Sequence, residues 1–169
     1  MFTIVLVVLV IFSIVIVVRS CVIVQQSEVI LIERLGTFNR VLKAGFQFIV
    51  PFIERPRYIL WTTNGLIEPT AVIDIRESVL DVPEQAVITK DNVSIHIDAI
   101  MYVQIVDPMK AAYEIQSLPL AVAQLAQTTL RNVIGEMDLD ATLGSRDVIN
   151  SKLKAVLDDA TEKWGLKVN

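Results

Sequence analysis

The sequence has few of the side chains that form disulfides and transition-metal sites. Its 169 residues include one cysteine, Cys21, and one histidine, His96. A single cysteine excludes an intramolecular disulfide, and one His with one Cys cannot supply the ligands of a zinc site. No block of basic residues is present, and the net charge is −4. We therefore expect no metal and no cofactor. We also expect no nucleic-acid partner, because a phosphate backbone needs a basic surface.

Motifs for enzymatic chemistry are also missing from the sequence. It contains no G-x-S-x-G, no H-E-x-x-H and no phosphate-binding loop. The acidic pair Asp138 and Asp140 is better interpreted as a cap at a helix junction than as a metal site. His96 has no nucleophile or metal partner in the pattern around it, and such a histidine is not a catalytic site. We predict no catalytic residues and no enzyme, with a membrane-tethered hydrolase as the disfavoured alternative.

Residues 1–18 form a long apolar run without charge, proline or glycine. A helix of this length approaches the thickness of the bilayer hydrocarbon, and Arg19 can extend its guanidinium to the headgroups. The run resumes at residues 22–24. The sequence therefore predicts a single N-terminal transmembrane helix over residues 1–24, followed by a domain over residues 25–169. Nine side chains are expected to carry the anchor: Phe2, Ile4, Leu6, Leu9, Ile11, Phe12, Ile14, Ile16 and Arg19.

Other interpretations of this run fit less well. A cleavable signal peptide needs a basic n-region and a small-residue cleavage site, and neither is present. A lipoprotein signal would have small residues before Cys21, where Arg19 stands, and a buried core segment would rarely run so long without a polar break. Basic residues follow the run and none precedes it. The positive-inside rule thus predicts a single-pass cell-membrane protein with its C-terminal domain on the cytoplasmic side.

The remaining sequence predicts an α+β domain with an antiparallel-type sheet and packed helices. Every second residue of 93–105 is apolar, which is typical of a strand with one buried face. Asn64-Gly65 predicts a hairpin or loop within residues 60–71, and Pro83 should break the extended segment before it. Shorter strands are predicted at residues 28–33, 40–42, 72–82, 85–89 and 166–168.

Helical periodicity replaces the alternation in the second half. Asp107 is an N-cap followed by Pro108 at the first helical position, and a longer helix is predicted over residues 120–135. Ser145 starts a third helix, which Gly165 ends. We expect its charged face, with Asp147, Lys154 and Asp158, to contact other copies in a homo-oligomer. The alternative is ordinary core packing of this helix with a solvated charged face.

Residues 46–53 are strongly apolar but contain a proline. Proline cannot donate to a central strand, so one interpretation is an edge strand that covers the core. The other is an apolar patch that leans on the bilayer. The candidate patch residues are Phe46, Phe48, Ile49, Pro51 and Phe52.

A series of short motifs in order resembles the stomatin/prohibitin/flotillin/HflK-HflC (SPFH, or band 7) family, closest to its bacterial slipin, paraslipin or QmcA-like branch. They include Glu33-Arg34-Leu35-Gly36, Val79-Leu80-Asp81-Val82-Pro83, Thr89-Lys90-Asp91-Asn92, Ile105-Val106-Asp107-Pro108, Gln124-Leu125-Ala126-Gln127-Thr128-Thr129-Leu130-Arg131 and Trp164-Gly165. Each motif alone is weak, but together they cover nearly all of residues 25–169. The long C-terminal helical region of the family is missing, so we expect that the natural protein continues.

The resemblance implies a band 7 domain on an N-terminal anchor. It also implies homo-oligomeric rings or cages that organise lipid and protein microdomains, with membrane protein quality control as an associated role. The lipid bilayer and further copies of the chain are then the expected partners. A regulatory subunit of one membrane protease has the same sequence features and remains an alternative.

Overall fold

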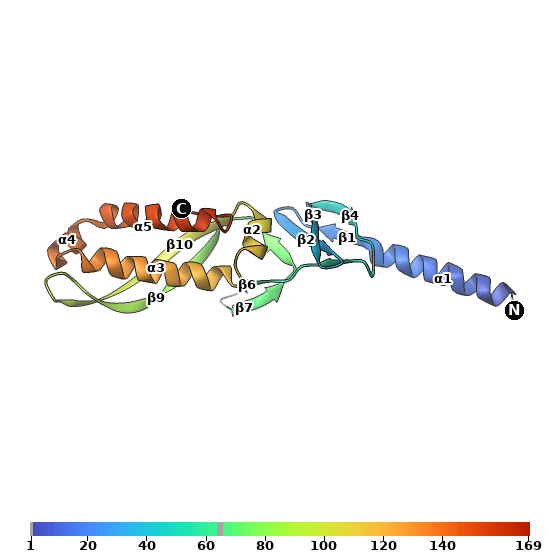
Figure 1. The fold of residues 1–169 in the computed structure, drawn as a ribbon, viewed down its shortest axis with the longest axis horizontal. Coiled ribbons are helices and arrows are strands. Elements are labelled where there is room, and N and C mark those ends of the chain that lie inside the picture. Colours follow the sequence, from blue (N-terminus) through green and yellow to red (C-terminus); the bar gives the residue numbers. More distant parts are fainter. Residues whose placement is uncertain (1, 64–65) are drawn as a thin grey trace. The chain divides into compact units, whose positions relative to one another are not determined.

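A computed structural model describes residues 2–63 and 66–169 and divides the chain into two compact units. Unit 1 comprises Met1–Tyr58 and Thr70–Asp74, and unit 2 comprises Ile59–Pro69 and Ile75–Asn169. Each unit combines strands with at least one helix (Figure 1). The mixed α+β architecture expected from the sequence is confirmed.

Unit 1 is built around a central strand that bonds to three others. Its elements are α1 (Phe2–Ser20), β1 (Cys21–Val24), β2 (Glu28–Arg34), β3 (Thr37–Leu42), β4 (Gly45–Phe48), β5 (Glu54–Pro56) and β8 (Val72–Asp74). Strand β2 pairs antiparallel with β3, β5 and β8, while β1 pairs antiparallel with β4. The core of this unit is a cluster of Val24, Ile30, Ile32 and Leu42. Four consecutive residues of β2, 29–32, are buried, which indicates that both of its faces are covered.

Unit 2 is a long hairpin covered by helices. Its elements are β6 (Ile59–Thr63), β7 (Leu66–Thr70), β9 (Ser78–Ile88), β10 (Ser94–Ile105), α2 (Pro108–Tyr113), α3 (Leu118–Gly135), α4 (Leu139–Gly144), α5 (Arg146–Glu162) and β11 (Leu166–Val168). The sheet order is β11-β10-β9, and both neighbours of β10 are antiparallel to it. Helix α3 packs on β9 and on α5 (Figure 1). Helix α5 also packs on β11. The core of this unit includes the buried residues Met101 and Val103 of the sheet and Val122, Ala126 and Leu157 of the helices.

Most elements after residue 25 lie where the sequence predicted them. The strand over 93–105, the cap at Asp107 and the ends of α3 and α5 agree with the expectation. Asp107 Oδ1 accepts the backbone N–H groups of Met109 and Lys110, at 3.1 and 3.2 Å. Helix α4 was not predicted, and the Asn64-Gly65 turn lies outside the described residues.

The predicted break at Pro83 is wrong, because β9 continues through it. The proline is tolerated for two reasons. Strand β9 is an edge strand, and its pairing with β10 is irregular between Ile97 and Ala99. At such a position the missing N–H removes no regular ladder hydrogen bond.

The predicted N-terminal transmembrane helix is also wrong. Within residues 2–63 and 66–169, no helix has both the length and the apolar character needed to cross a bilayer. Helix α1 ends with Arg19 and Ser20, and the chain becomes strand β1 at Cys21. Its apolar part rises roughly 25 Å at about 1.5 Å per residue, less than the ~30 Å of hydrocarbon. Val22 and Ile23, expected to prolong the span, pair with β4 instead.

Candidate functional site

One face of the β1–β4 sheet exposes large apolar side chains. Ile23 lies opposite Phe46 in the register, and both are exposed, at 77% and 59%. Phe48 is exposed at 58%, and its ring meets that of Phe46 edge to face with centroids 4.9 Å apart. Val22 and Val24 point the other way, against the core, because side chains alternate along a strand. We call Ile23, Phe46 and Phe48 the β1–β4 apolar face.

A buried carboxylate fixes the segment that follows this face. The Glu54 side chain has no exposed surface, and Arg34 and Arg40 donate to its two oxygens at 2.9 and 3.0 Å. Asn39 Nδ2 and the backbone N–H of Val50 donate to the same carboxylate at 2.9 and 3.0 Å. Strands β2 and β3 and the turn before β5 are thus tied to one residue.

The charge state of Glu54 follows from these bonds. The hydrogen bond from the Val50 N–H is the largest effect that holds its pKa below the ordinary value. Burial opposes this by raising the pKa, and the Arg34 and Arg40 guanidinium groups lower it further. Glu54 is therefore ionised at neutral pH and neutralises part of the positive charge of the two arginines.

Two turns of unit 1 hold large apolar residues in left-handed backbone conformations. Leu35 and Gly36 link β2 to β3 as a two-residue turn with φ of 51° and 87°, and Phe52 has φ of 74°. The backbone N–H of Leu35 donates to the carbonyl of Ile53, at 3.3 Å. Leu35 is 83% exposed and Phe52 is 79% exposed. A two-residue turn with positive φ at both positions favours Asn, Asp or Gly, so Leu35 occupies it at a conformational cost.

A cavity of about 280 Å³ lies beside these turns. It is lined by Glu33, Leu35, Gly36, Phe52, Ile53 and Arg55. We call it the Leu35–Phe52 cavity. This cavity is not predictable from the sequence, because nothing in the order of residues brings the 35–36 turn next to the 52–53 turn.

The structure divides the patch predicted over residues 46–53. Phe46, Phe48 and Phe52 are exposed, whereas Pro51 is half-buried and Ile49 packs against the core cluster. Only β4 is a strand, and Pro51 lies in the turn that follows it. The backbone N–H of Ile49 donates to Ser20 O at 2.8 Å, which joins the end of β4 to the end of α1.

The side chains expected to carry the anchor lie on α1. Those of Ile4, Leu6, Leu9 and Ile11 are each more than half exposed, at 67%, 55%, 59% and 56%. Arg19 is also exposed. The side chains of Phe2, Phe12, Ile14 and Ile16 lie outside the described part of the structure.

The predicted oligomer contacts share one face of α5. Asp147, Lys154 and Asp158 are separated by seven and four residues, which places them on one side of a helix. Asp147 and Lys154 are exposed, and Asp158 is half-buried. Asp158 also lines a cavity of about 460 Å³ with Lys110, Glu162 and Lys167. Ile149, Leu153 and Leu157 point to the core, so the helix packs and also exposes a charged face.

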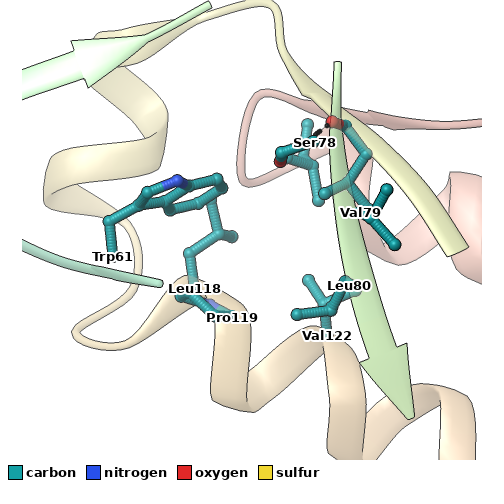
Figure 2. Close-up of a pocket in the computed structure, with 9 residues that line it drawn as sticks. Trp61, Ser78, Val79, Leu80, Leu118, Pro119 and Val122 are labelled. Atoms are coloured by element: carbon teal, nitrogen blue, oxygen red, sulfur yellow. Dashed lines mark hydrogen bonds between the residues drawn. The ribbon is translucent and has the colours of Figure 1, made fainter. Parts of the chain in front are cut away.

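A third, much smaller cavity lies inside unit 2 (Figure 2). Figure 2 shows Trp61 of β6 over Leu118 and Pro119, which begin α3, with Leu80 and Val122 nearby. The free volume is about 20 Å³, room for about one water molecule. We interpret this site as packing of the β6–β7 hairpin on α3.

His96 and Asp138, which the sequence patterns singled out, have few side-chain contacts. His96 is exposed, and its Nδ1 lies 3.0 Å from Glu84 Oε1. Asp138 begins α4 without a side-chain cap bond, and Asp91 accepts the backbone N–H of Leu139 instead. Within the described ranges, no group of three or more His, Cys, Asp or Glu residues could hold a metal ion.

Comparison with known proteins identifies relatives. An uncharacterised protein of Mycobacterium tuberculosis is 44% identical over 163 residues, covering 96% of this chain and 39% of that protein. A stomatin homolog of Pyrococcus horikoshii is 38% identical over 144 residues, covering 85% of this chain and 49% of the homolog. Human stomatin-like protein 2, mitochondrial, is 34% identical over 142 residues, covering 84% of this chain and 36% of its own length. The chain thus spans less than half the length of these relatives.

The family assignment rests on a match that covers most of the chain. Residues 22–169 match the family described as SPFH domain / Band 7. This range includes the strands of unit 1, apart from Cys21 at the start of β1, and all of unit 2. The resemblance read from the sequence motifs is therefore confirmed, while the branch within the family stays a prediction. The chain belongs to the SPFH domain / Band 7 family.

Proposed function

We propose that this chain is a membrane-associated, homo-oligomeric scaffold whose unit 1 lies against the lipid surface. The β1–β4 apolar face carries the proposal, because soluble proteins rarely expose adjacent large apolar side chains without a partner. Exposed apolar residues of α1 and the residues Leu35 and Phe52 give unit 1 further apolar surface. Amphipathic surfaces bind a bilayer in proportion to the apolar area that they bury in it.

The charge distribution supports the same orientation. Unit 1 has six Arg and Lys residues and four Asp and Glu residues, a formal charge of +2, whereas the whole chain carries −4. Unit 2 therefore carries −6. Cellular membrane surfaces are commonly anionic, so they attract unit 1 and repel unit 2.

Lipid binding is tested by flotation of the 169-residue chain with vesicles of zwitterionic phosphatidylcholine. We expect the double variant Phe46→Ser/Phe48→Ser to bind at least roughly tenfold more weakly, because each buried aromatic contributes about 1.5–3 kcal/mol. Ile100→Ser is the matched control, since Ile100 is 65% exposed but belongs to unit 2. Equal binding of the double variant and the control would overturn the role of this face.

Assembly is the second part of the proposal. The Asp147, Lys154 and Asp158 face of α5 offers charges of both signs to a neighbouring copy, and repeated heterologous contacts close into rings when the rotation allows. We expect either Lys154→Asp or Asp147→Lys alone to reduce the fraction of lipid-bound protein that is assembled. Light scattering measures this fraction. Combining the two should restore part of it, because opposite charges then meet again. A combined variant as defective as the singles would refute the pairing.

Organisation of microdomains and membrane protein quality control are the roles that we assign to such an assembly. A regulatory subunit of a single membrane protease is the alternative. Co-purification separates the two: an assembly that retains one protease at fixed ratio would favour the alternative.

A further inference from the structure

The Leu35–Phe52 cavity combines an apolar rim with one cation, Arg55, and one carboxylate, Glu33. Leu35 and Phe52 form exposed parts of the rim, and Arg55 lies among the lining residues. Its volume of about 280 Å³ is at the small end of ligand sites, which suits a compact polar group better than a whole lipid. The cavity therefore has the composition of a site at a boundary between lipid and water.

Arg55 differs from the other arginines of this sheet. Arg34 and Arg40 both donate to Glu54, and Arg57 Nη1 lies 3.4 Å from Glu33 Oε1. Arg55 pairs in the backbone register with Glu33, yet its exposed guanidinium has no carboxylate partner among the described residues. Glu33, the carboxylate of the lining, pairs with Arg57 outside the cavity, so Arg55 is the lining cation whose charge is left for a ligand. An arginine fork of this kind matches the oxygens of a phosphate group.

The rim residues Leu35 and Phe52 have backbone conformations that are unfavourable for their residue types. Leu35 and Phe52 both have positive φ, in conformations that side chains other than Gly, Asn and Asp rarely adopt. Burial of the two side chains does not offset this conformational cost, since they are 83% and 79% exposed. Strain of this kind concentrates at ligand sites, and here it projects two apolar side chains next to a cation.

We propose that this cavity binds the phosphate of an anionic phospholipid headgroup at the bilayer surface. The Arg55 guanidinium contacts the phosphate oxygens, while Leu35 and Phe52 enter the apolar layer below the headgroups. This inference rests on the proposed membrane association and adds to it a preference for one class of lipid. A zwitterionic headgroup is disfavoured because its ammonium group brings a second cation close to Arg55.

The experiment compares two vesicle types, phosphatidylcholine alone and phosphatidylcholine containing phosphatidylglycerol. It uses the 169-residue chain and two variants that each remove one positive charge from unit 1, Arg55→Gln and Lys43→Gln. Lys43 is exposed and does not line the cavity. Arg55→Lys keeps the charge without the fork, and thermal unfolding of each variant checks that it is folded.

We expect the wild-type chain to prefer phosphatidylglycerol vesicles, and Arg55→Gln to lose about tenfold in affinity for them. Lys43→Gln should lose about fivefold or less, the effect of one cation near an anionic surface. Arg55→Lys should lie between the wild type and Arg55→Gln. Binding of all forms to phosphatidylcholine alone should be unchanged.

Three outcomes would overturn the inference. Equal losses for Arg55→Gln and Lys43→Gln would reduce the preference to general charge attraction. Equal wild-type affinity for the two vesicle types would remove the preference and leave the proposed membrane association intact. No binding to either vesicle would remove both.

Discussion

The carbonyl oxygen of Gly165 accepts the backbone N–H of Asp107 at 2.9 Å, which joins the end of α5 to the start of α2. The N–H of Val106 donates to the same oxygen, also at 2.9 Å. Gly165 has φ of +67°, and a Cβ built on it would lie 2.5 Å from Asp107 O and 2.7 Å from Asp107 Cβ. The two helices therefore meet at a position where only glycine fits.

Gly165→Ala should destabilise the chain by about 3 kcal/mol. The new methyl group meets the backbone of Asp107, and alanine has a conformational cost at positive φ. Urea unfolding measures the loss. Gly144→Ala is the control, because a Cβ there has nothing within 4 Å, and we expect it to change stability by less than about 1 kcal/mol. Equal effects of the two substitutions would contradict the close approach.

Leu35→Asn should stabilise the chain by about 1 kcal/mol and weaken its binding to vesicles. Asparagine adopts the left-handed conformation of this turn more easily than leucine, and it removes an exposed apolar side chain. Thermal unfolding and vesicle flotation measure the two effects on the same protein. Leu35→Ala separates them, since it removes the side chain without relieving the backbone. If Leu35→Asn lowered stability, the turn would not be strained in the way that φ indicates.

The stability of unit 1 should fall in acid because of Glu54. Its pKa in the folded chain lies below the ordinary 4.5, so the ionised form stabilises the fold at and above that pH. This contribution is lost as the pH falls below 4.5 through the folded pKa, because protonation then weakens the bonds to Arg34 and Arg40. Urea unfolding followed by far-ultraviolet circular dichroism at several pH values gives the slope of the unfolding free energy against pH. Glu54→Gln should flatten the slope in this window, and an unchanged slope would exclude Glu54 as its source.

Removal of the Glu54 side chain tests the same residue at neutral pH. Glu54→Ala leaves Asn39 Nδ2 and the Val50 N–H without their acceptor and two arginines without their counter-charge. We expect a loss on the order of 3 kcal/mol, because a broken buried ion pair leaves uncompensated charge. Urea unfolding measures it. Glu28→Ala serves as a control in the same unit, and a comparable loss there would argue against a special role for Glu54.

Asp91→Ala should loosen the start of α4. Thr89 donates its hydroxyl to Asp91, and Leu139 donates its backbone N–H to the same carboxylate at 3.3 Å. The side-chain hydrogen bond from Thr89 is the largest effect that lowers the pKa of Asp91. Hydrogen exchange of Leu139 and the rest of α4 should become faster in the variant, and Asp138→Ala should have a smaller effect because Asp138 makes no cap bond. The reverse order would contradict this assignment.

Local sequence patterns predicted the helices and strands whose conformation is set by residues close to one another in the sequence. The period of two over residues 93–105 gave β10, and Asp107 with Pro108 gave the start of α2. Residue order along the chain also carried the family resemblance. Such features depend on alternation, capping and turn geometry, which act over a few residues.

Only the tertiary structure determined how distant segments meet. Glu54 is ordinary in the sequence, and it becomes a buried centre because three other parts of unit 1 supply its hydrogen-bond donors. Val22 and Ile23 extend an apolar run in the sequence, yet strand pairing with β4 ends α1 before them and turns Ile23 outward. Arg55 and the Leu35 turn, twenty residues apart, line one cavity because β5 pairs with β2. The sequence by itself determined local conformation and family, whereas long-range backbone pairing decided which side chains are buried, which are exposed and which share a site.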